Sequence, residues 1–366
     1  MMPPSAAAGP IPETNPRPAR RPRYPGKNPR AFHQKYKELN SESYPETVRK
    51  VEASGKTAAG THRPICTQEI LGVLSPRPGQ IGIDATLGYG GHAERLLQSL
   101  NPGGFLLGLD TDGVQLQRAT ARLRTLGYGP ESFEGIQTNF AGIGRLVPAR
   151  WPGGVDFILA DLGCSSMQLD DPLRGFSFKH QGPLDMRMNQ NKGPSAAEWL
   201  GSVKEDRLAR ALREHGDVLN AEAMARGLCD ARKSAPIRTT TDLKEIVRRL
   251  CPMLGGKLRS PKDPVIEPII RQVFQAVRIA VNDEFSALEM FLRAAAGCLK
   301  PGGRLAVLTF HSGEDRRVKA ALKRDGARGV YGAVAGDVLR PAAEEIRGNP
   351  RASSAKLRWA VKAPSA

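Results

Sequence analysis

The sequence has few of the features that mark membrane-embedded, secreted or metal-binding proteins. No apolar run approaches the roughly 18 residues that a membrane-spanning helix needs, and the N-terminus lacks the apolar core of a secretory signal. Only five cysteines occur among 366 residues, and no two of them form a Cys-x-x-Cys pair. Because their number is odd and their spacing wide, they favour neither a disulfide framework nor a zinc site. We therefore expect a protein of a reducing compartment with no membrane span and no bound metal.

Acidic residues are scarce relative to basic ones. Lys and Arg number 54 against 37 Asp and Glu, which gives a formal net charge of +17. A protein that binds a polyanion needs such an excess, whereas an enzyme that acts on small molecules does not. A generally arginine-rich composition is the alternative explanation. On charge alone we favour nucleic acid as the partner.

Residues 1–60 differ from the rest of the chain. Pro, Gly and Arg dominate the first 30 residues, and residues 1–56 hold eleven Lys or Arg against five Glu, a net charge of +6. Such a stretch buries too little apolar surface to fold alone, so we expect a disordered extension. A basic arm that lies on phosphates and an idle, solvated tail are both compatible with it. The prolines argue against an amphipathic organellar transit peptide.

Short apolar segments alternate with helical segments from residue 80 onward. Strand patterns occupy residues 81–84, 105–110, 155–161 and 304–310. Helical spacing of apolar residues occurs at 92–100 and 114–126. Strands separated by helices of this length predict parallel β-α-β units, and hence an α/β fold.

The alternation stops between residues 170 and 275. This segment carries charged helical patterns, such as residues 203–215, and shows no clear strand pattern. One long amphipathic helix is then expected over residues 273–297, after which the strand pattern resumes. The predicted division assigns residues 61–169 and 276–366 to the α/β domain and residues 170–275 to an inserted, mainly helical domain.

A glycine-rich turn follows the first expected strand. Residues 84–92 read Asp-Ala-Thr-Leu-Gly-Tyr-Gly-Gly-His, and glycines there let the backbone turn tightly and approach a ligand closely. A tight structural connection would use the same glycines. The third glycine of Gly-x-Gly-x-x-Gly would fall at Ala93 or Glu94, so the turn lacks the pyrophosphate fingerprint. This absence argues against a nicotinamide-dependent oxidoreductase.

Asp110 ends the second expected strand, 19 residues after Gly91. An acidic residue at this place accepts hydrogen bonds from ribose hydroxyls, although it can also serve as a helix cap. A glycine turn without pyrophosphate spacing, combined with a ribose-binding acid, favours an adenosyl ligand that lacks phosphates. S-adenosylmethionine fits this description.

Further polar residues end the other expected strands. Asp161 ends the strand at residues 155–161, and His311 follows the strand at residues 304–310. In open α/β sheets, ligands bind beyond the carboxyl ends of the strands. We therefore expect Asp84, Asp110 and Asp161 to point toward one crevice. His311 is expected at the same rim, where a histidine is more often structural than catalytic.

Longer motifs extend this pattern along the chain. The most specific are Phe-Ser-Phe at 176–178, Pro-Leu-Asp-Met-Arg-Met at 183–188 and Phe-Gln-Ala at 274–276. The other motifs occupy residues 84–92, 161–170, 196–200, 310–312 and 349–351. In this order, from about residue 62 to the C-terminus, the chain resembles the MraW-type family of bacterial methyltransferases. That family methylates the exocyclic amino group of a cytidine in small-subunit (16S) ribosomal RNA.

The resemblance implies a Rossmann-like class I methyltransferase sheet with S-adenosylmethionine as cofactor. The residues that match the family's cofactor-binding positions are Gly90, Gly91, His92, Asp110, Phe140, Asp161 and Gln168. The insert at 170–275 matches the family's substrate-recognition domain. The implied partner is ribosomal RNA or the small ribosomal subunit, in the bacterial cytoplasm. An organellar location is the alternative if residues 1–60 are a targeting segment.

The resemblance also allows candidate catalytic residues to be named. Asp161 is the first candidate to accept a hydrogen of the amine, His311 could take the proton, and Asp185 is a third candidate. Phe176 and Phe178 are candidates to stack on the target base, with a place in the helical core as the alternative.

Five features depart from the family pattern. Tyr89 stands where an arginine is usual, Gly313 replaces a bulkier apolar residue, and residues 62–66 read His-Arg-Pro-Ile-Cys in place of the family's His-x-Pro-Val-Leu. The stretch 253–271 is longer, and residues 1–60 are extra.

Two other functions remain open. A non-catalytic RNA-binding assembly factor would tolerate loss of the cofactor residues, which are all present. A DNA amino-methyltransferase would show Asp-Pro-Pro-Tyr or a relative of it at residues 161–164, which read Asp-Leu-Gly-Cys.

Overall fold

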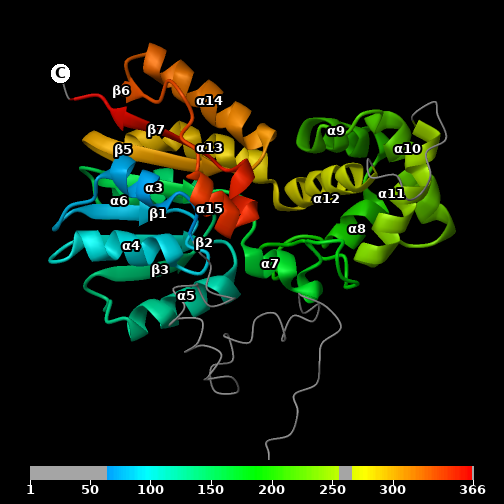
Figure 1. The fold of residues 1–366 in the computed structure, drawn as a ribbon, viewed down its shortest axis with the longest axis horizontal. Helices are drawn as coiled ribbons and strands as arrows, with labels where there is room; N and C mark the ends of the chain where they lie inside the picture. The colour runs from blue at the N-terminus through cyan, green and yellow to red at the C-terminus, as the bar shows by residue number, and fades with distance from the viewer. Residues whose placement is uncertain (1–63, 255–265, 365–366) are drawn as a thin grey trace, which may run out of the picture.

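The computed structural model describes residues 64–254 and 266–364, and its centre is a seven-stranded sheet (Figure 1). The strands are β1 (Ile81–Asp84), β2 (Phe105–Asp110), β3 (Phe133–Gln137), β4 (Val155–Asp161), β5 (Leu299–Thr309), β6 (Tyr331–Val334) and β7 (Lys356–Lys362). Their order in the sheet is β3-β2-β1-β4-β5-β7-β6. Strands β1 to β5 run parallel, whereas β7 runs antiparallel to both β5 and β6. The Rossmann-like α/β class is confirmed.

Helices cover both faces of the sheet because its strands are apolar on both sides. The covering helices are α3 (Thr67–Leu74), α4 (Gly91–Leu100), α5 (Gly113–Thr125), α6 (Ile143–Arg150), α13 (Glu284–Cys298) and α14 (Ser312–Ala327). Ile158 and Leu159, neighbours on β4, point to opposite faces, as the period of two along a strand requires. Ile158 joins a core with α6, α13 and α14, and Leu159 joins one with α3, α4 and α5.

A group of helices lies beside the sheet with a core of its own (Figure 1). It contains α8 (Ala196–Ser202), α9 (Glu205–Gly216), α10 (Ala221–Ser234), α11 (Thr240–Leu254) and most of α12 (Ile266–Asn282). The buried members of this core run from Phe176 to Val277. Among its described residues the backbone forms no strand, although an isolated bridge joins Pro183 and Thr239. Partly buried residues packed against this core extend along α12 to Val281.

The single helix expected over residues 273–297 is wrong. Helix α12 ends at Asn282 and α13 begins at Glu284, because Asp283 between them has a left-handed φ of 50°. Aspartate tolerates this conformation better than most residues. Apolar residues continue on both sides of the break, so the pattern could not reveal it. The break turns the chain from the helical group back onto the sheet.

Three strands were not expected, namely β3, β6 and β7. β6 and β7 carry alternating polar or small residues instead of a continuous apolar run, and β3 has one fully buried position. The expected extension at residues 1–60 lies outside the described residues. No helix in the described part of the chain is long and apolar enough to cross a membrane.

Candidate active site at the carboxyl edge of the sheet

A cavity of about 610 Å³ opens where strands β1, β2, β4 and β5 end. The residues predicted for a site that line it are Gly91, His92, Asp110, Phe140, Asp161, Gln168 and His311. Arg278, Asn282 and Glu284 line it from the end of α12 and the start of α13. The cavity therefore lies between the sheet edge and the segment that connects the helical group to it.

The glycine turn leads from β1 into α4 along this cavity. Gly90 is the N-cap of α4 with a φ of 80°, a conformation that glycine adopts without steric cost. Gly90 itself does not line the cavity, whereas Gly88, Tyr89 and Gly91 do. The turn thus presents the N-terminus of α4 and a stretch of exposed backbone to any ligand in the cavity.

Asp110 lies at the end of β2 and holds the glycine turn. Its Oδ2 accepts a hydrogen bond from the Gly88 N–H at 2.7 Å, and its Oδ1 accepts one from the Asp112 N–H at 2.8 Å. Burial raises the pKa of the Asp110 carboxyl to about 6, although these backbone hydrogen bonds oppose the shift. Each carboxylate oxygen can accept a second hydrogen bond, so the group remains able to bind a ribose hydroxyl.

Asp161 lies at the end of β4, across the cavity from Asp110. Its backbone N–H donates to Thr86 Oγ1 at 2.6 Å, and its Oδ2 lies 3.4 Å from His92 Nε2. Its Oδ1 is buried and has no hydrogen-bond partner among the described residues. Burial lowers the pKa of His92, but the carboxylates of Asp161 and Asp84 outweigh it and raise that pKa. Asp161 lines the cavity with a side chain that is 16% exposed, although its Oδ1 is withdrawn from solvent.

Asp84 does not point into the cavity, contrary to the expectation from its place at a strand end. It is 1% exposed and lies beneath the glycine turn, where its Oδ1 accepts a hydrogen bond from the Thr86 N–H at 3.2 Å. Burial raises the pKa of its carboxyl to about 7, with His92 acting in the opposite direction. Asp84 thus supports the site from beneath, through Thr86 and His92.

The raised pKa of Asp84 predicts a pH-dependent gain from Asp84→Asn. The folded state binds this proton more tightly than the unfolded chain, so the ionised group lowers stability increasingly as pH rises from about 4 to about 7. At pH 8 we expect the variant to unfold with a free energy higher by up to about 4 kcal/mol, and by less at pH 5. Urea denaturation at both pH values measures this. An equal effect at pH 5 and pH 8 would contradict the assignment.

A cluster of charged side chains, which sequence reasoning missed, forms the other end of the cavity. Arg278 donates from Nε and Nη2 to the two carboxylate oxygens of Glu284, each at 2.9 Å. Glu314 is 3% exposed, accepts a hydrogen bond from the Phe310 N–H at 2.9 Å, and lies 3.0 Å from His311 Nε2. The sequence did contain one indication of these residues, because they are charged positions within helix patterns that are otherwise apolar.

His311 is held by Glu314 from both sides of its ring. Its Nδ1 accepts from the Glu314 N–H at 3.4 Å, which caps α14, while Nε2 faces the Glu314 carboxylate. Burial would raise the pKa of Glu314, but His311 and Arg278 lower it below its usual value. His311 and Glu314 therefore form one paired unit at the cavity wall.

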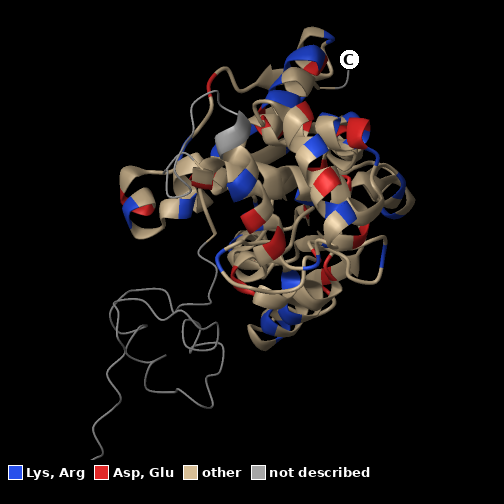
Figure 2. Cartoon of the chain, turned by 90° about the vertical axis from the view of Figure 1, so that its right-hand side faces the viewer, with Lys and Arg blue, Asp and Glu red and all other residues tan. Residues whose placement is uncertain are grey.

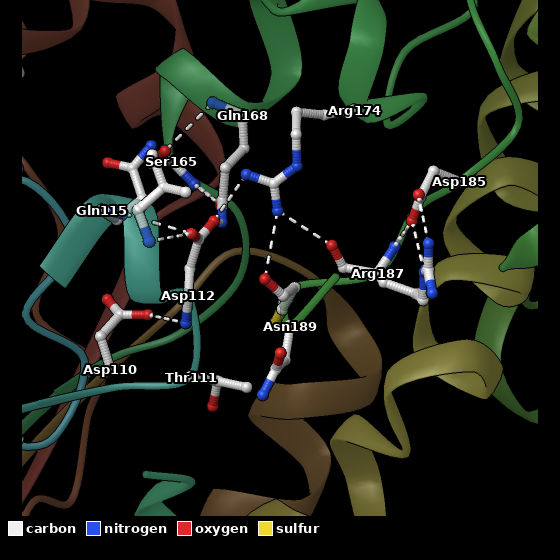
Figure 3. A network of polar contacts seen from close by, with 12 residues as sticks. Asp110, Thr111, Asp112, Gln115, Ser165, Gln168, Arg174, Asp185, Arg187 and Asn189 are labelled. Atoms are coloured by element: carbon white, nitrogen blue, oxygen red, sulfur yellow. Dashed lines mark hydrogen bonds and ion pairs between the residues drawn. The ribbon is translucent and has the colours of Figure 1, made fainter. Parts of the chain in front are cut away.

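Two of the predicted site residues have other partners. Gln168 lines the cavity, but its Oε1 accepts from the Ser165 N–H at 3.0 Å and its Nε2 donates to Asp112 Oδ2 at 2.9 Å (Figure 3). Asp185 does not line the cavity and is paired with Arg187 at 2.8 Å. Gln168 thus forms part of the cavity wall. Asp185 lies outside the cavity.

The two phenylalanines considered for base stacking lie in the helical core. Phe176 is 5% exposed, and Phe178 packs edge-on against Phe274 with ring centroids 5.3 Å apart. Neither lines the cavity. Phe285 does line it, and its ring lies only 2.6 Å from where a Cβ on Gly313 would be. The glycine that departs from the family pattern therefore makes room for this ring.

Comparison with known proteins identifies the family. A family model described as the MraW methylase family matches residues 59–363. The chain belongs to this family. A relative from Alkaliphilus metalliredigens, named ribosomal RNA small subunit methyltransferase H 2, is 46% identical over 345 residues, covering 94% of this chain and 97% of the relative. One from Lachnoclostridium phytofermentans, named ribosomal RNA small subunit methyltransferase H 1, is 44% identical, covering 94% of this chain and 93% of the relative.

Membership in the MraW methylase family confirms the enzyme class expected from the sequence, a methyltransferase that uses S-adenosylmethionine. The residues at the cavity suit that cofactor. The N-terminus of α4 and the Asp110 carboxylate offer groups for its polar parts, and Phe140 offers an apolar ring. Phe140 is held edge-on against Phe291 with centroids 5.4 Å apart, so its orientation is fixed.

Proposed function

We propose that this enzyme transfers a methyl group from S-adenosylmethionine to the exocyclic amino group of a cytidine in small-subunit ribosomal RNA. One observation carries the proposal: a single cavity is lined by a ribose-type acid, Asp110, by the carboxylate of Asp161 and by the charged cluster of Arg278, Glu284 and Glu314. The names of the relatives and the net charge of +17 support an RNA substrate.

The donor binds at the β1–β2 end of the cavity. Gly90 and Gly91 shape the turn, Asp110 accepts hydrogen bonds from the ribose, and Phe140 flanks the adenine. His92 is 7% exposed and holds Asp161 in place. When bound, the cofactor supplies an electrophilic methyl group on a positively charged sulfur.

The remaining task of the protein is to make an amine with a delocalised lone pair reactive. The Asp161 carboxylate accepts one hydrogen of the amine and so favours the geometry in which the lone pair points at the methyl group. Holding both reactants in line supplies several kcal/mol of the barrier reduction, on the order seen for oriented reactants. The His311–Glu314 pair then accepts the proton that the amine loses.

The acceptor end also suits a cytosine. Its amine is a hydrogen-bond donor, and carboxylates are the side chains that accept from it. Arg278 and Glu284 present a guanidinium and a carboxylate side by side at this end. The base must leave its stack to enter the cavity, and a partly single-stranded substrate lowers that cost.

The helical group is proposed as the substrate-recognition domain, with the division at residues 170–275 that the sequence suggests. Figure 2, which faces this group, shows Lys and Arg positions on its helices among Asp and Glu positions. On the exposed face of α9, Arg207 and Arg210 are available for phosphate contacts. The partner would be the small ribosomal subunit, in the bacterial cytoplasm.

Methylation mapping of ribosomal RNA tests the proposal. We expect one cytidine of the small-subunit RNA to lose its methyl group in cells that lack the gene and to regain it on complementation. Complementation with Asp161→Asn separates the enzyme from an RNA-binding assembly factor, because a factor would function without turnover. An unchanged methylation map in the deletion strain would refute the proposed substrate.

A further inference from the structure

A buried arginine outside the cavity links the turn after β2 to a segment that ends at the cavity wall. Arg174 donates from Nη1 to Asp112 Oδ2 at 2.7 Å, and from Nη2 to the carbonyl oxygens of Arg187 at 2.9 Å and Met188 at 3.2 Å (Figure 3). Arg174 is 7% exposed and Asp112 is 2% exposed. Both charged groups are therefore withdrawn from solvent and held by several hydrogen bonds.

Asp112 is fixed to the donor end of the site. Its backbone N–H donates to Asp110 Oδ1 at 2.8 Å, and its own Oδ1 caps α5 by accepting from the backbone N–H groups of Val114 and Gln115. Its Oδ2 is shared between Gln168 and Arg174. The Asp112 carboxylate is thus anchored in the same turn that places the ribose-binding acid.

The other partner of Arg174 is a segment that we call the strap, residues 186–188. Its first residue, Met186, has a left-handed φ of 59°, and its last, Met188, lines the cavity. Asn282 binds the strap as well, donating to the Met186 carbonyl at 2.7 Å and accepting from the Met188 N–H at 2.7 Å. Arg174 and Asn282 therefore hold the strap between the donor turn and the break before α13.

Stability alone does not explain a buried arginine at this place. A buried ion pair is often no more stable than a well-packed apolar pair of the same volume, because both charges lose their hydration. The planar guanidinium, however, sets three acceptors in fixed directions at once. An apolar residue at this position could match the free energy of folding, but it could not fix the directions of these three hydrogen bonds.

We propose that Arg174 is a positioning residue for methyl transfer. By joining Asp112 to the strap, Arg174 sets the distance between the donor turn and the cavity wall formed by Met188 and Asn282. The acceptor base would contact this wall. The inference rests on the proposed function for the identity of the acceptor. Arg174 touches neither reactant in this account and acts through the strap.

Variants of both partners test the positioning role. With ribosomal RNA as acceptor, Arg174→Met should lower the single-turnover rate by about 10²-fold, as for a misplacement of about 1 Å. Affinity for S-adenosylhomocysteine should change by no more than about threefold, because the ground-state donor contacts remain. Arg174→Lys should not rescue the rate, since an ammonium lacks the planar fork. Asp112→Asn combined with Arg174→Met should be no slower than Arg174→Met alone, because the two act as one unit.

A matched control and a second measurement complete the test. Arg316→Ala removes another arginine that joins the sheet to the helical group, through Asp217 at 2.9 Å, but on the exposed surface. It should leave the rate unchanged. Hydrogen exchange should increase at the strap in Arg174→Met and not in Arg316→Ala, whatever the RNA substrate is. Unchanged strap protection, or equal losses of rate and donor affinity, would overturn the positioning role. An inactive wild type with a loosened strap in the variant would instead refute the proposed substrate.

Discussion

Asp161→Asn should lower the single-turnover rate of methyl transfer by about 10² to 10³-fold, the range for loss of one hydrogen-bonding group that stabilises the transition state. The wild-type carboxylate has only acceptor oxygens, whereas an amide at this position presents either a weaker acceptor or a donor to the amine. The donor affinity should change only a few-fold, because the proposed ribose and adenine contacts come from Asp110 and Phe140. Rapid-quench assays with labelled donor measure the rate, and calorimetry measures the affinity.

A control for this variant lies on the same strand. Asp156 is at the opposite end of β4, where its carboxylate accepts from the Ile81 N–H and from Lys300 Nζ, each at 2.8 Å. Asp156→Asn removes the same charge from the same strand without touching the cavity, so the rate should stay near that of the wild type. Full single-turnover activity in Asp161→Asn would remove Asp161 from the reaction.

Asp110→Ala is expected to weaken donor binding by roughly 1.5–3 kcal/mol, as for the loss of a charged hydrogen bond. The loss has two sources, because the carboxylate both faces the cavity and holds the Gly88 N–H of the turn. Asp110→Asn keeps one acceptor oxygen and should lose less. Calorimetry with S-adenosylhomocysteine measures both variants.

A residue on the neighbouring strand provides the control for Asp110. Glu134 on β3 pairs with Arg150 and does not line the cavity, so Glu134→Ala should bind the donor like the wild type. Unchanged donor affinity in Asp110→Ala would exclude Asp110 as the ribose acid. A loss confined to Asp110→Ala would support it.

The sequence alone predicted three strands and two of the polar residues at their ends. Strands β1, β2 and β4 have the predicted bounds, and the polar residues at the ends of β2 and β4 do line one cavity. The rule that parallel strands present their carboxyl ends to one crevice needs no knowledge of packing. It failed for Asp84, because whether a strand-end side chain points outward or inward depends on the turn that follows.

The charged cluster was out of reach for a different reason. Arg278 and Glu284 are six residues apart, and only the left-handed Asp283 brings their side chains into a bidentate pair. Glu314 follows His311 by three residues and looks like an ordinary acid in the first turn of a helix. Such contacts depend on backbone breaks and caps that a hydrophobic pattern does not encode.

The chain order of the sheet has a consequence for folding during synthesis. Strands β4 and β5 are hydrogen-bonded neighbours, yet residues 162–298, a stretch of 137, separate them in the chain. At a synthesis rate of roughly 5–20 residues per second, β4 waits about 7–27 s for its partner. The first four strands therefore emerge with one edge of β4 unpaired, and contacts this distant in sequence form slowly. The donor turn can be complete during this interval, but His311 and Glu314 are not yet made, so the nascent chain has no route to methyl transfer until β5 closes the sheet.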